Sequence, residues 1–248
     1  MSPTCAGTYP YTVRPGDTLW MIAQRFHTTV EEIASANPGL DANNLFIGQV
    51  ICIPQRSGRA PMPAARMEMN HGKLALNNLM RLLWEQHVFW TRLVVLGIVF
   101  GLPDTEFSIN RLLRNPEDFE AALAPLYGDD IAAEFAQLLT SHLTIAAELV
   151  QAMKAGDGAA AANAEKRWYA NADQIATFLS DINPYWTAQE WRRMLYDHLA
   201  MTKTEATDLL TQKYADSDTI FDNIEREALE MADLMTLGII RQFPKSFR

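Results

Sequence analysis

Three histidines stand at equivalent places in three apolar helical segments, where they could bind a transition metal. His87, His142 and His198 each lie on the apolar stripe of their segment, so all three imidazoles are expected to point into a protein core. Imidazole is a common ligand of zinc, copper, nickel and iron, and carboxylates of neighbouring helices could complete such a site. The candidate carboxylates are Glu148, Asp173, Glu205 and Asp222.

The same histidines could instead form a buried polar layer that fixes the register of the helices. In that case each ring would be hydrogen-bonded to an Asp, Glu, Thr or Asn side chain. The chain has neither the Glu-x-x-His pair of di-iron bundles nor a His-x-x-x-His pair. Both interpretations stay open on the sequence, and we assign no catalytic residue and no required cofactor. Arg92 lies one turn beyond His87 in the same apolar segment, and we expect it to pair with a carboxylate of a neighbouring helix.

Long helices must position these residues, and the sequence predicts such helices from about residue 70 onward. Apolar residues recur there at helical spacing, and Gly, Pro and Asn-Pro pairs mark the breaks. No strand is expected in this part of the chain. We expect long helices over 71–100, 128–155, 159–182, 187–212 and 216–241, with short helical pieces over 105–126.

This helical part repeats internally. Residues 132–143 and 188–199 align with one another, which places His142 opposite His198, and the helix over 71–100 follows the pattern more weakly. A partner helix follows each copy. The repeat therefore predicts helical hairpins stacked into an all-α bundle of four to six helices that spans residues 70–248.

The first fifty-odd residues have a different pattern. Tyr-Thr-Val-Arg at 11–14 predicts a strand, Gly-Asp-Thr at 16–18 a turn, and the apolar spacing over 19–26 an amphipathic helix. A second helix is expected from Thr29 to Asn-Pro at 37–38, and a second strand over 49–53. The order of elements is therefore β-α-α-β.

This stretch, with Tyr-Thr-Val-Arg-Pro-Gly-Asp-Thr-Leu-Trp at 11–20 and Leu-Phe-Ile-Gly-Gln-Val-Ile-Cys-Ile-Pro at 45–54, resembles a LysM module over residues 9–54. LysM modules bind the N-acetylglucosamine-type backbone of peptidoglycan or chitin. The resemblance implies a shallow groove between the loop after the first strand and the loop before the second. The implied contacts are Gly16, Asp17, Thr18, Leu19, Asn44, Leu45, Phe46, Ile47 and Gly48.

The chain is thus expected to be an α+β multidomain protein. Residues 1–55 form the LysM module, 56–69 are a linker rich in Pro, Gly, Ser and Arg, and 70–248 are the bundle. The bundle is similar to a domain that accompanies LysM modules in spore-forming bacteria, in stretches such as His-Val-Phe-Trp-Thr-Arg at 87–92 and Trp-Tyr-Ala-Asn-Ala-Asp at 168–173. That resemblance implies a bacterial envelope or spore setting, and no reaction.

Both cysteines of the chain, Cys5 and Cys52, fall in the LysM-like stretch. They could be two unrelated small apolar residues. A bridge between them would instead tie the leader before the first strand to the second strand, adding roughly 4 kcal/mol in the chain-entropy model. The redox compartment decides between the two.

Composition limits the classes of molecule that we expect this protein to bind. A net charge of -9 and the lack of a basic patch argue against nucleic acid but not against a neutral glycan. The apolar run over 93–102 is too short to span a bilayer, so no membrane span is expected. The first residues show no basic region followed by an apolar one, so no export signal is recognised and the route of export stays unknown.

These observations favour a non-enzymatic protein of the cell wall or spore envelope that binds peptidoglycan or chitin-type glycan. The bundle would then be a cargo or assembly domain. The sequence leaves open whether the chain forms a homo-oligomer. Two alternatives remain on the sequence: a metal-binding bundle or enzyme anchored by the LysM module, and a structural subunit of a spore coat or surface filament.

Overall fold

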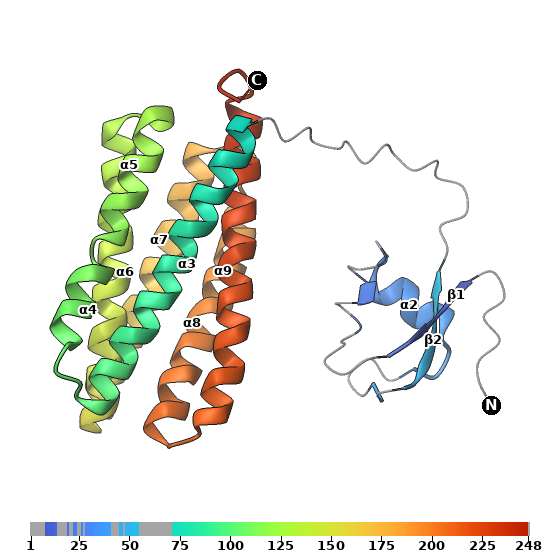
Figure 1. Cartoon of the computed structure of the whole chain (residues 1–248), viewed down its shortest axis with the longest axis horizontal. Coiled ribbons are helices and arrows are strands. Elements are labelled where there is room, and N and C mark those ends of the chain that lie inside the picture. Colours follow the sequence, from blue (N-terminus) through green and yellow to red (C-terminus); the bar gives the residue numbers. More distant parts are fainter. Residues whose placement is uncertain are drawn as a thin grey trace. The chain divides into compact units, whose positions relative to one another are not determined.

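The computed structural model describes residues 8–13, 19, 22–23, 26, 28–40, 45–46, 48–54 and 71–247. The chain divides into two compact units, residues 1–67 and 68–248, and each is described by itself (Figure 1). The linker predicted over 56–69 lies outside the described residues.

The first unit is built on a two-stranded antiparallel sheet. β1 (Thr8–Thr12) pairs with β2 (Val50–Pro54), with Tyr11 opposite Ile51. Leu19, Ile22 and Ala23 are helical, as predicted from their spacing. The small core of this unit is formed by Tyr11, Val13, Leu19, Ile22, Ala23, Ile33, Ile51 and Ile53.

The second helix of this unit, α2 (Val30–Ala36), begins and ends where the sequence predicts. Thr29 and Glu32 form a capping box, in which each side chain accepts a hydrogen bond from the backbone N–H of the other. Asn37 ends the helix, and its side chain pairs with the outer edge of β2. Its side chain accepts from the N–H of Cys52 and donates to the carbonyl of the same residue, both at 2.7 Å.

The second unit is helical, with no strand over the described residues, and has seven helices there rather than the predicted four to six; five are long, and α4 and α5 are the short pieces. The helices lie within a few residues of their predicted positions, so the predicted helical region with hairpin repeats is confirmed. They are α3 (His71–Phe100), α4 (Thr105–Leu112), α5 (Asn115–Tyr127), α6 (Asp129–Ala155), α7 (Gly158–Ile182), α8 (Ala188–Leu210) and α9 (Tyr214–Gln242).

These helices pack as a closed ring of neighbours. From α5 to α9 each helix packs on the next along the chain, α9 packs on α3, and α3 contacts α5, which closes the ring; α4 packs on α3. In addition, α3, α6 and α8 contact one another across the interior. The bundle thus consists of three hairpins, and the first helix of each hairpin lies on the inside.

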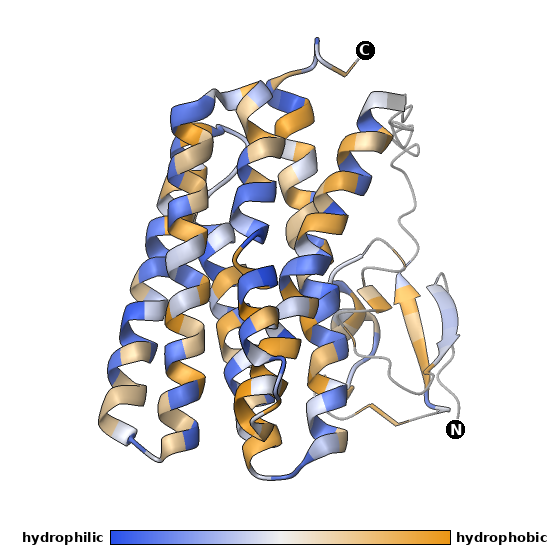
Figure 2. Cartoon of the chain, turned by 60° about the vertical axis from the view of Figure 1, so that its left-hand side comes forward, coloured by the Kyte–Doolittle hydropathy of each residue, from blue (hydrophilic) through white to orange (hydrophobic). Residues whose placement is uncertain are grey.

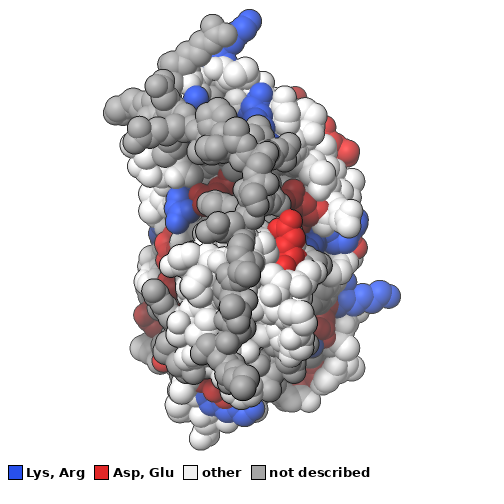
Figure 3. Space-filling view, turned by 90° about the vertical axis from the view of Figure 1, so that its right-hand side faces the viewer, with Lys and Arg blue, Asp and Glu red and all other residues white. Residues whose placement is uncertain are grey.

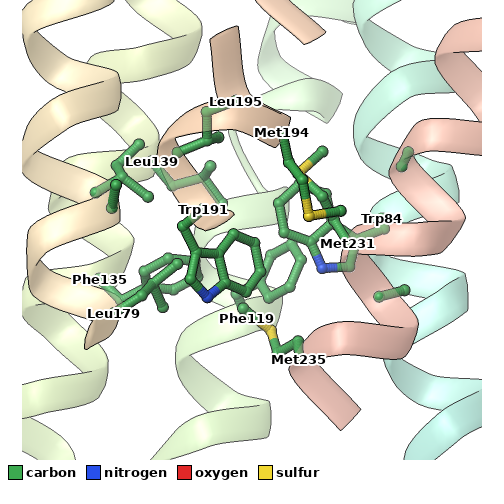
Figure 4. Close-up of a cluster of buried hydrophobic side chains, with 14 of the residues drawn as sticks. Trp84, Phe119, Phe135, Leu139, Leu179, Trp191, Met194, Leu195, Met231 and Met235 are labelled. Atoms are coloured by element: carbon green, nitrogen blue, oxygen red, sulfur yellow. The ribbon is translucent and has the colours of Figure 1, made fainter. Parts of the chain in front are cut away.

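Hydrophobic and hydrophilic residues alternate along the helices (Figure 2), and the buried hydrophobic ones fill the interior, while α3 also exposes Leu82 and Phe89. The larger of the two apolar clusters in the bundle is rich in aromatic residues (Figure 4). Trp84 of α3 stacks on Trp191 of α8, and Phe119 of α5 packs edge-on against Phe135 of α6. The smaller cluster, around Val94, lies at the end of the bundle where α3 meets α4.

Among the described residues one helix, α3, is long and apolar enough by composition to cross a membrane. Leu83, Trp84 and Val88 on its inner face are buried in the core of the bundle. On the face shown in Figure 3 the described acidic and basic side chains are interspersed, and no extended basic patch is present among them.

Tight packing of α9 against the α7–α8 connection generates a stability prediction. A Cβ atom added at Gly238 would lie 1.9 Å from Nε1 of Trp186, which donates to the carbonyl of Leu234 at 3.1 Å. We expect Gly238→Ala to lower the free energy of unfolding by about 2–3 kcal/mol, because the buried indole must move and its hydrogen bond is strained. Urea denaturation followed by circular dichroism measures this.

Gly158→Ala is the matched control, because Gly158 starts α7 and a Cβ there meets open space. It should leave stability unchanged or raise it slightly. Equal stability of the two variants would contradict the packing described for Trp186.

Candidate functional site

One candidate site is the turn that precedes β2, which is held against the end of β1. Val13 accepts a hydrogen bond from the N–H of Gly48 and donates to the carbonyl of Gln49, both at 2.8 Å. The N–H of Gln49 donates to the carbonyl of Phe46, which closes a four-residue turn. Gly48, the third residue of this turn, has φ +86°, which is the reason for a glycine at that position.

Phe46 is the most exposed large apolar side chain of the first unit's described residues, at 64% exposure. Its N–H donates to Oε1 of Gln49 at 2.9 Å, so its backbone is fixed while its ring is open to solvent. Leu45 is half-buried and packs on the core. Leu19 is only 2% exposed, so its side chain belongs to the core rather than to the surface that was predicted to contact a glycan.

The other predicted contacts cannot be placed. Gly16, Asp17, Thr18, Asn44 and Ile47 lie outside the described residues. Cys52 is disulfide-bonded. The other cysteine of the chain, Cys5, also lies outside the described residues, so the predicted bridge stays a prediction.

Comparison with known proteins identifies the first unit. Residues 11–54 match the LysM domain family model, so the resemblance read from the sequence is confirmed for this part of the chain. The chain is 46% identical over 48 residues to a secreted LysM effector of Beauveria bassiana and 42% identical over 53 residues to one of Colletotrichum higginsianum. It is also 48% identical over 44 residues to a putative L,D-transpeptidase of Bacillus licheniformis.

These similarities are confined to short stretches. They cover 19%, 21% and 18% of this chain, and 28%, 30% and 27% of the respective relatives. The chain therefore spans about three tenths of the length of the curated relatives that it matches. No solved structure matches the chain.

A second candidate site lies inside the bundle, where the three predicted histidines come together. His87, His142 and His198 project from the inner helices α3, α6 and α8, and all three are buried. The ring centroid of His87 lies 6.2 Å from that of His142 and 5.8 Å from that of His198. We call these residues the histidine trio.

Each ring of the trio is hydrogen-bonded through Nδ1 to the second helix of its own hairpin, which is α5 for His87, α7 for His142 and α9 for His198. His87 contacts Oδ1 of Asn115 at 3.3 Å and His142 contacts Oδ1 of Asn171 at 2.9 Å. For His198 the acceptor is Oε2 of Glu227, at 3.0 Å. The separations along the chain are 28, 29 and 29 residues, so the internal repeat extends to these acceptors.

The orientation of the two asparagines fixes the protonation of the rings. Nδ2 of Asn115 donates to the carbonyl of Leu83, and Nδ2 of Asn171 donates to the carbonyl of Leu138. In each case Oδ1 must then face the imidazole, because the flipped amide would bring two oxygens together. An oxygen acceptor at Nδ1 requires Nδ1 to carry the proton. The Glu227 carboxylate sets the same tautomer for His198.

The candidate carboxylates named from the sequence lie elsewhere. Glu205 is buried but accepts from Nη1 of Arg92 at 2.5 Å, and Nη2 of Arg92 donates to Asp218 at 2.6 Å. The expected pairing of Arg92 is thus confirmed. Asp173 is half-exposed and bonds Arg192 and Tyr196, Asp222 is exposed, and Glu148 pairs with Arg167.

The carboxylate that does contact the trio, Glu227, was missed from the sequence, as was Asn115. The spacing of 28 or 29 residues from each histidine is the signal that finds both. Asp173 and Asp222, the carboxylates expected from the sequence on α7 and α9, lie on more exposed faces of these helices.

Burial controls the ionisation of this region. It lowers the pKa of His142 from 6.5 to about 3, and the neighbouring His198 lowers it further. The pKa of His87 is also lowered well below its usual value, by burial and then by the other two rings. Burial raises the pKa of Glu205 to about 7, although Arg92 opposes this shift. The structure therefore holds His87 and His142 neutral at neutral pH.

These shifts predict acid sensitivity of the metal-free protein. A lowered folded-state pKa means that the unfolded chain binds a proton that folded His142 does not, so stability is lost as pH falls below 6.5 toward about 3. One such group adds up to about 1.4 kcal/mol per pH unit to the slope of unfolding free energy against pH. Urea denaturation at several pH values in the presence of a chelator measures the slope.

The slope should be compared with that of His142→Gln, in which the titrating ring is removed. Glu205 acts in the opposite direction, because its raised pKa makes it stabilising below 4.5 and costs stability as pH rises toward 7. Because Glu205 is present in both proteins, its contribution cancels when the slope of the variant is subtracted from the slope of the wild type. An identical slope for both proteins would show that His142 is not kept neutral by the fold.

Proposed function

We propose that the protein binds an N-acetylglucosamine-containing glycan, peptidoglycan or chitin, through its LysM module. The observation that carries the proposal is the match of residues 11–54 to the LysM domain family. The proposed contact surface is the turn at Phe46–Gln49 together with the loop that follows β1. An exposed aromatic ring beside a rigid turn suits a sugar, since the ring covers apolar C–H groups while backbone amides meet hydroxyl and acetamido groups.

The proposed role of the module is attachment rather than catalysis. A shallow groove on a single small module binds a short sugar weakly, so retention depends on a long glycan or on several modules acting together. The helical bundle is then the domain that the module carries to the polymer, as cargo or as an assembly domain.

The proposed setting is the cell wall or spore envelope of a bacterium. The names of two relatives include the word secreted, and a third is a putative L,D-transpeptidase of a Bacillus species. A disulfide at Cys52 is consistent with an oxidising, extracytoplasmic setting.

Sedimentation of the full chain with insoluble polymer tests this function. We expect the protein to sediment with peptidoglycan, with chitin or with both, and soluble N-acetylglucosamine oligomers to compete. Phe46→Ala should weaken binding roughly five-fold, because the loss of an aromatic contact costs about 1 kcal/mol.

Phe107→Ala serves as the matched control, since Phe107 is also a strongly exposed phenylalanine but lies in α4 of the helical unit. It should bind like the wild type. No sedimentation above that of an unrelated acidic protein would overturn the proposed function. Equal losses for the two variants would remove Phe46 from the contact surface.

A further inference from the structure

We propose that the histidine trio binds one divalent transition-metal ion of the kind that prefers imidazole, such as Zn²⁺, through the Nε2 atoms of His87, His142 and His198. This site is in the helical bundle and is independent of the glycan proposal. Its chemistry is that of a three-histidine site with one open coordination position.

The tautomer of the rings supplies the first argument. Nδ1 of every ring carries the proton and faces Asn115, Asn171 or Glu227. In the neutral form of each ring the Nε2 lone pair is therefore free, and none of the hydrogen bonds between described residues uses it. A histidine that ligates a metal commonly donates its second N–H to a carboxylate or carbonyl oxygen, which orients the ring and raises its basicity. All three members of the trio have this arrangement.

The spacing of the rings is close to what such a site needs. In a tetrahedral site with metal–nitrogen bonds of about 2.1 Å, ring centroids lie about 5 Å apart. The separations of 5.8 and 6.2 Å around His87 are about 1 Å larger. Accordingly, no group of three or more His, Cys, Asp or Glu side chains in the described part of the chain is already placed to hold a metal ion. The proposal therefore requires the rings to move about 1 Å closer together when the ion binds.

Charge near the trio favours a cation. Oε1 of Glu227 is buried and has no hydrogen-bond partner, while Oε2 of the same carboxylate bonds His198. A buried carboxylate with one oxygen unsatisfied is costly unless a positive charge lies near it. A divalent ion with one bound hydroxide leaves a single positive charge, which Glu227 balances. The Arg92–Glu205 ion pair is already neutral in itself.

Two buried donors beside the trio also have no acceptor. Nε1 of Trp84 and Nε1 of Trp168 are both unpartnered, and their rings lie 5.7 Å from His87 and 5.3 Å from His142. A metal-bound water or hydroxide is an acceptor of the kind that these donors lack.

A mainly apolar cavity lies close to the trio, although none of the three histidines lines it. Its lining includes Thr91 and Thr202, which lie one turn beyond His87 and His198 on the same helices. Their hydroxyls donate to the backbone carbonyls of those two histidines, so they do not compete for a metal. The rest of the lining is mainly apolar, which suits a small uncharged molecule.

Metal binding to the full chain, purified without a polyhistidine tag, tests the proposal. The protein is stripped with a chelator and titrated with Co²⁺ alone, with the visible absorption of tetrahedral Co²⁺ as the readout, and Zn²⁺ is then added in competition. We expect one ion per chain, displacement by Zn²⁺, and a higher thermal unfolding temperature with metal.

Three variants locate the ion. His142→Gln should reduce affinity at least roughly 100-fold by removing one ligand, and Glu227→Gln, which keeps the size of the side chain, should reduce it about 10- to 100-fold. His71→Gln removes a histidine that is not part of the trio and should bind like the wild type. Glu227→Gln also serves where His142→Gln fails to fold.

Three outcomes would overturn the proposal: stoichiometry far below one ion per chain, loss of binding in His71→Gln, or unchanged binding in both His142→Gln and Glu227→Gln. The first would assign the trio to a buried polar layer that holds water. Failure of glycan sedimentation leaves this result unaffected, since the two measurements address different units of the chain.

Discussion

The bundle depends on the hydrogen bond between each buried imidazole and the second helix of its hairpin. Three polar rings can occupy the interior only where each finds an acceptor, since an unsatisfied buried polar group costs about 1–3 kcal/mol. Asn115, Asn171 and Glu227 supply those acceptors one per hairpin. A slip of any hairpin by one turn would separate its pair, so the polar contacts select the register that apolar packing alone would leave less defined.

Apolar packing in turn encloses this polar layer. The aromatic cluster around Trp84 and Trp191 lies on one side of it, and the smaller cluster around Val94 lies on the other. Inside such a core an imidazole is held neutral, which is the reason for the lowered pKa of His142. The repeat places one ring on each inner helix, so the three hairpins contribute equivalent imidazoles without any local sequence motif.

Much of this arrangement is predictable from sequence, because helix breaks and apolar periodicity are local signals. The positions of the long helices and the burial of His87, His142 and His198 follow from them. Which carboxylate meets a histidine depends on how two helices rotate against each other, and Glu227 was missed for that reason. In the first unit, the side chain of Leu19 is buried, so a contact of this residue with a glycan would have to come from its backbone; a motif does not separate a core side chain from a surface one.

The closure of the helical ring by α3 and α9 has a consequence for connectivity. Asn77 and Arg81 near the start of α3 both bond Asp233 near the end of α9, across 156 and 152 residues of sequence. The start of α3 and the end of α9 are the first and last parts of the bundle along the chain, and they therefore lie side by side. A short peptide could join them, and new termini could be opened at the glycine-rich α6–α7 turn, so that the fold tolerates circular permutation. The bundle then does not depend on which hairpin comes first in the chain. It depends on the order in which the hairpins follow one another around the bundle.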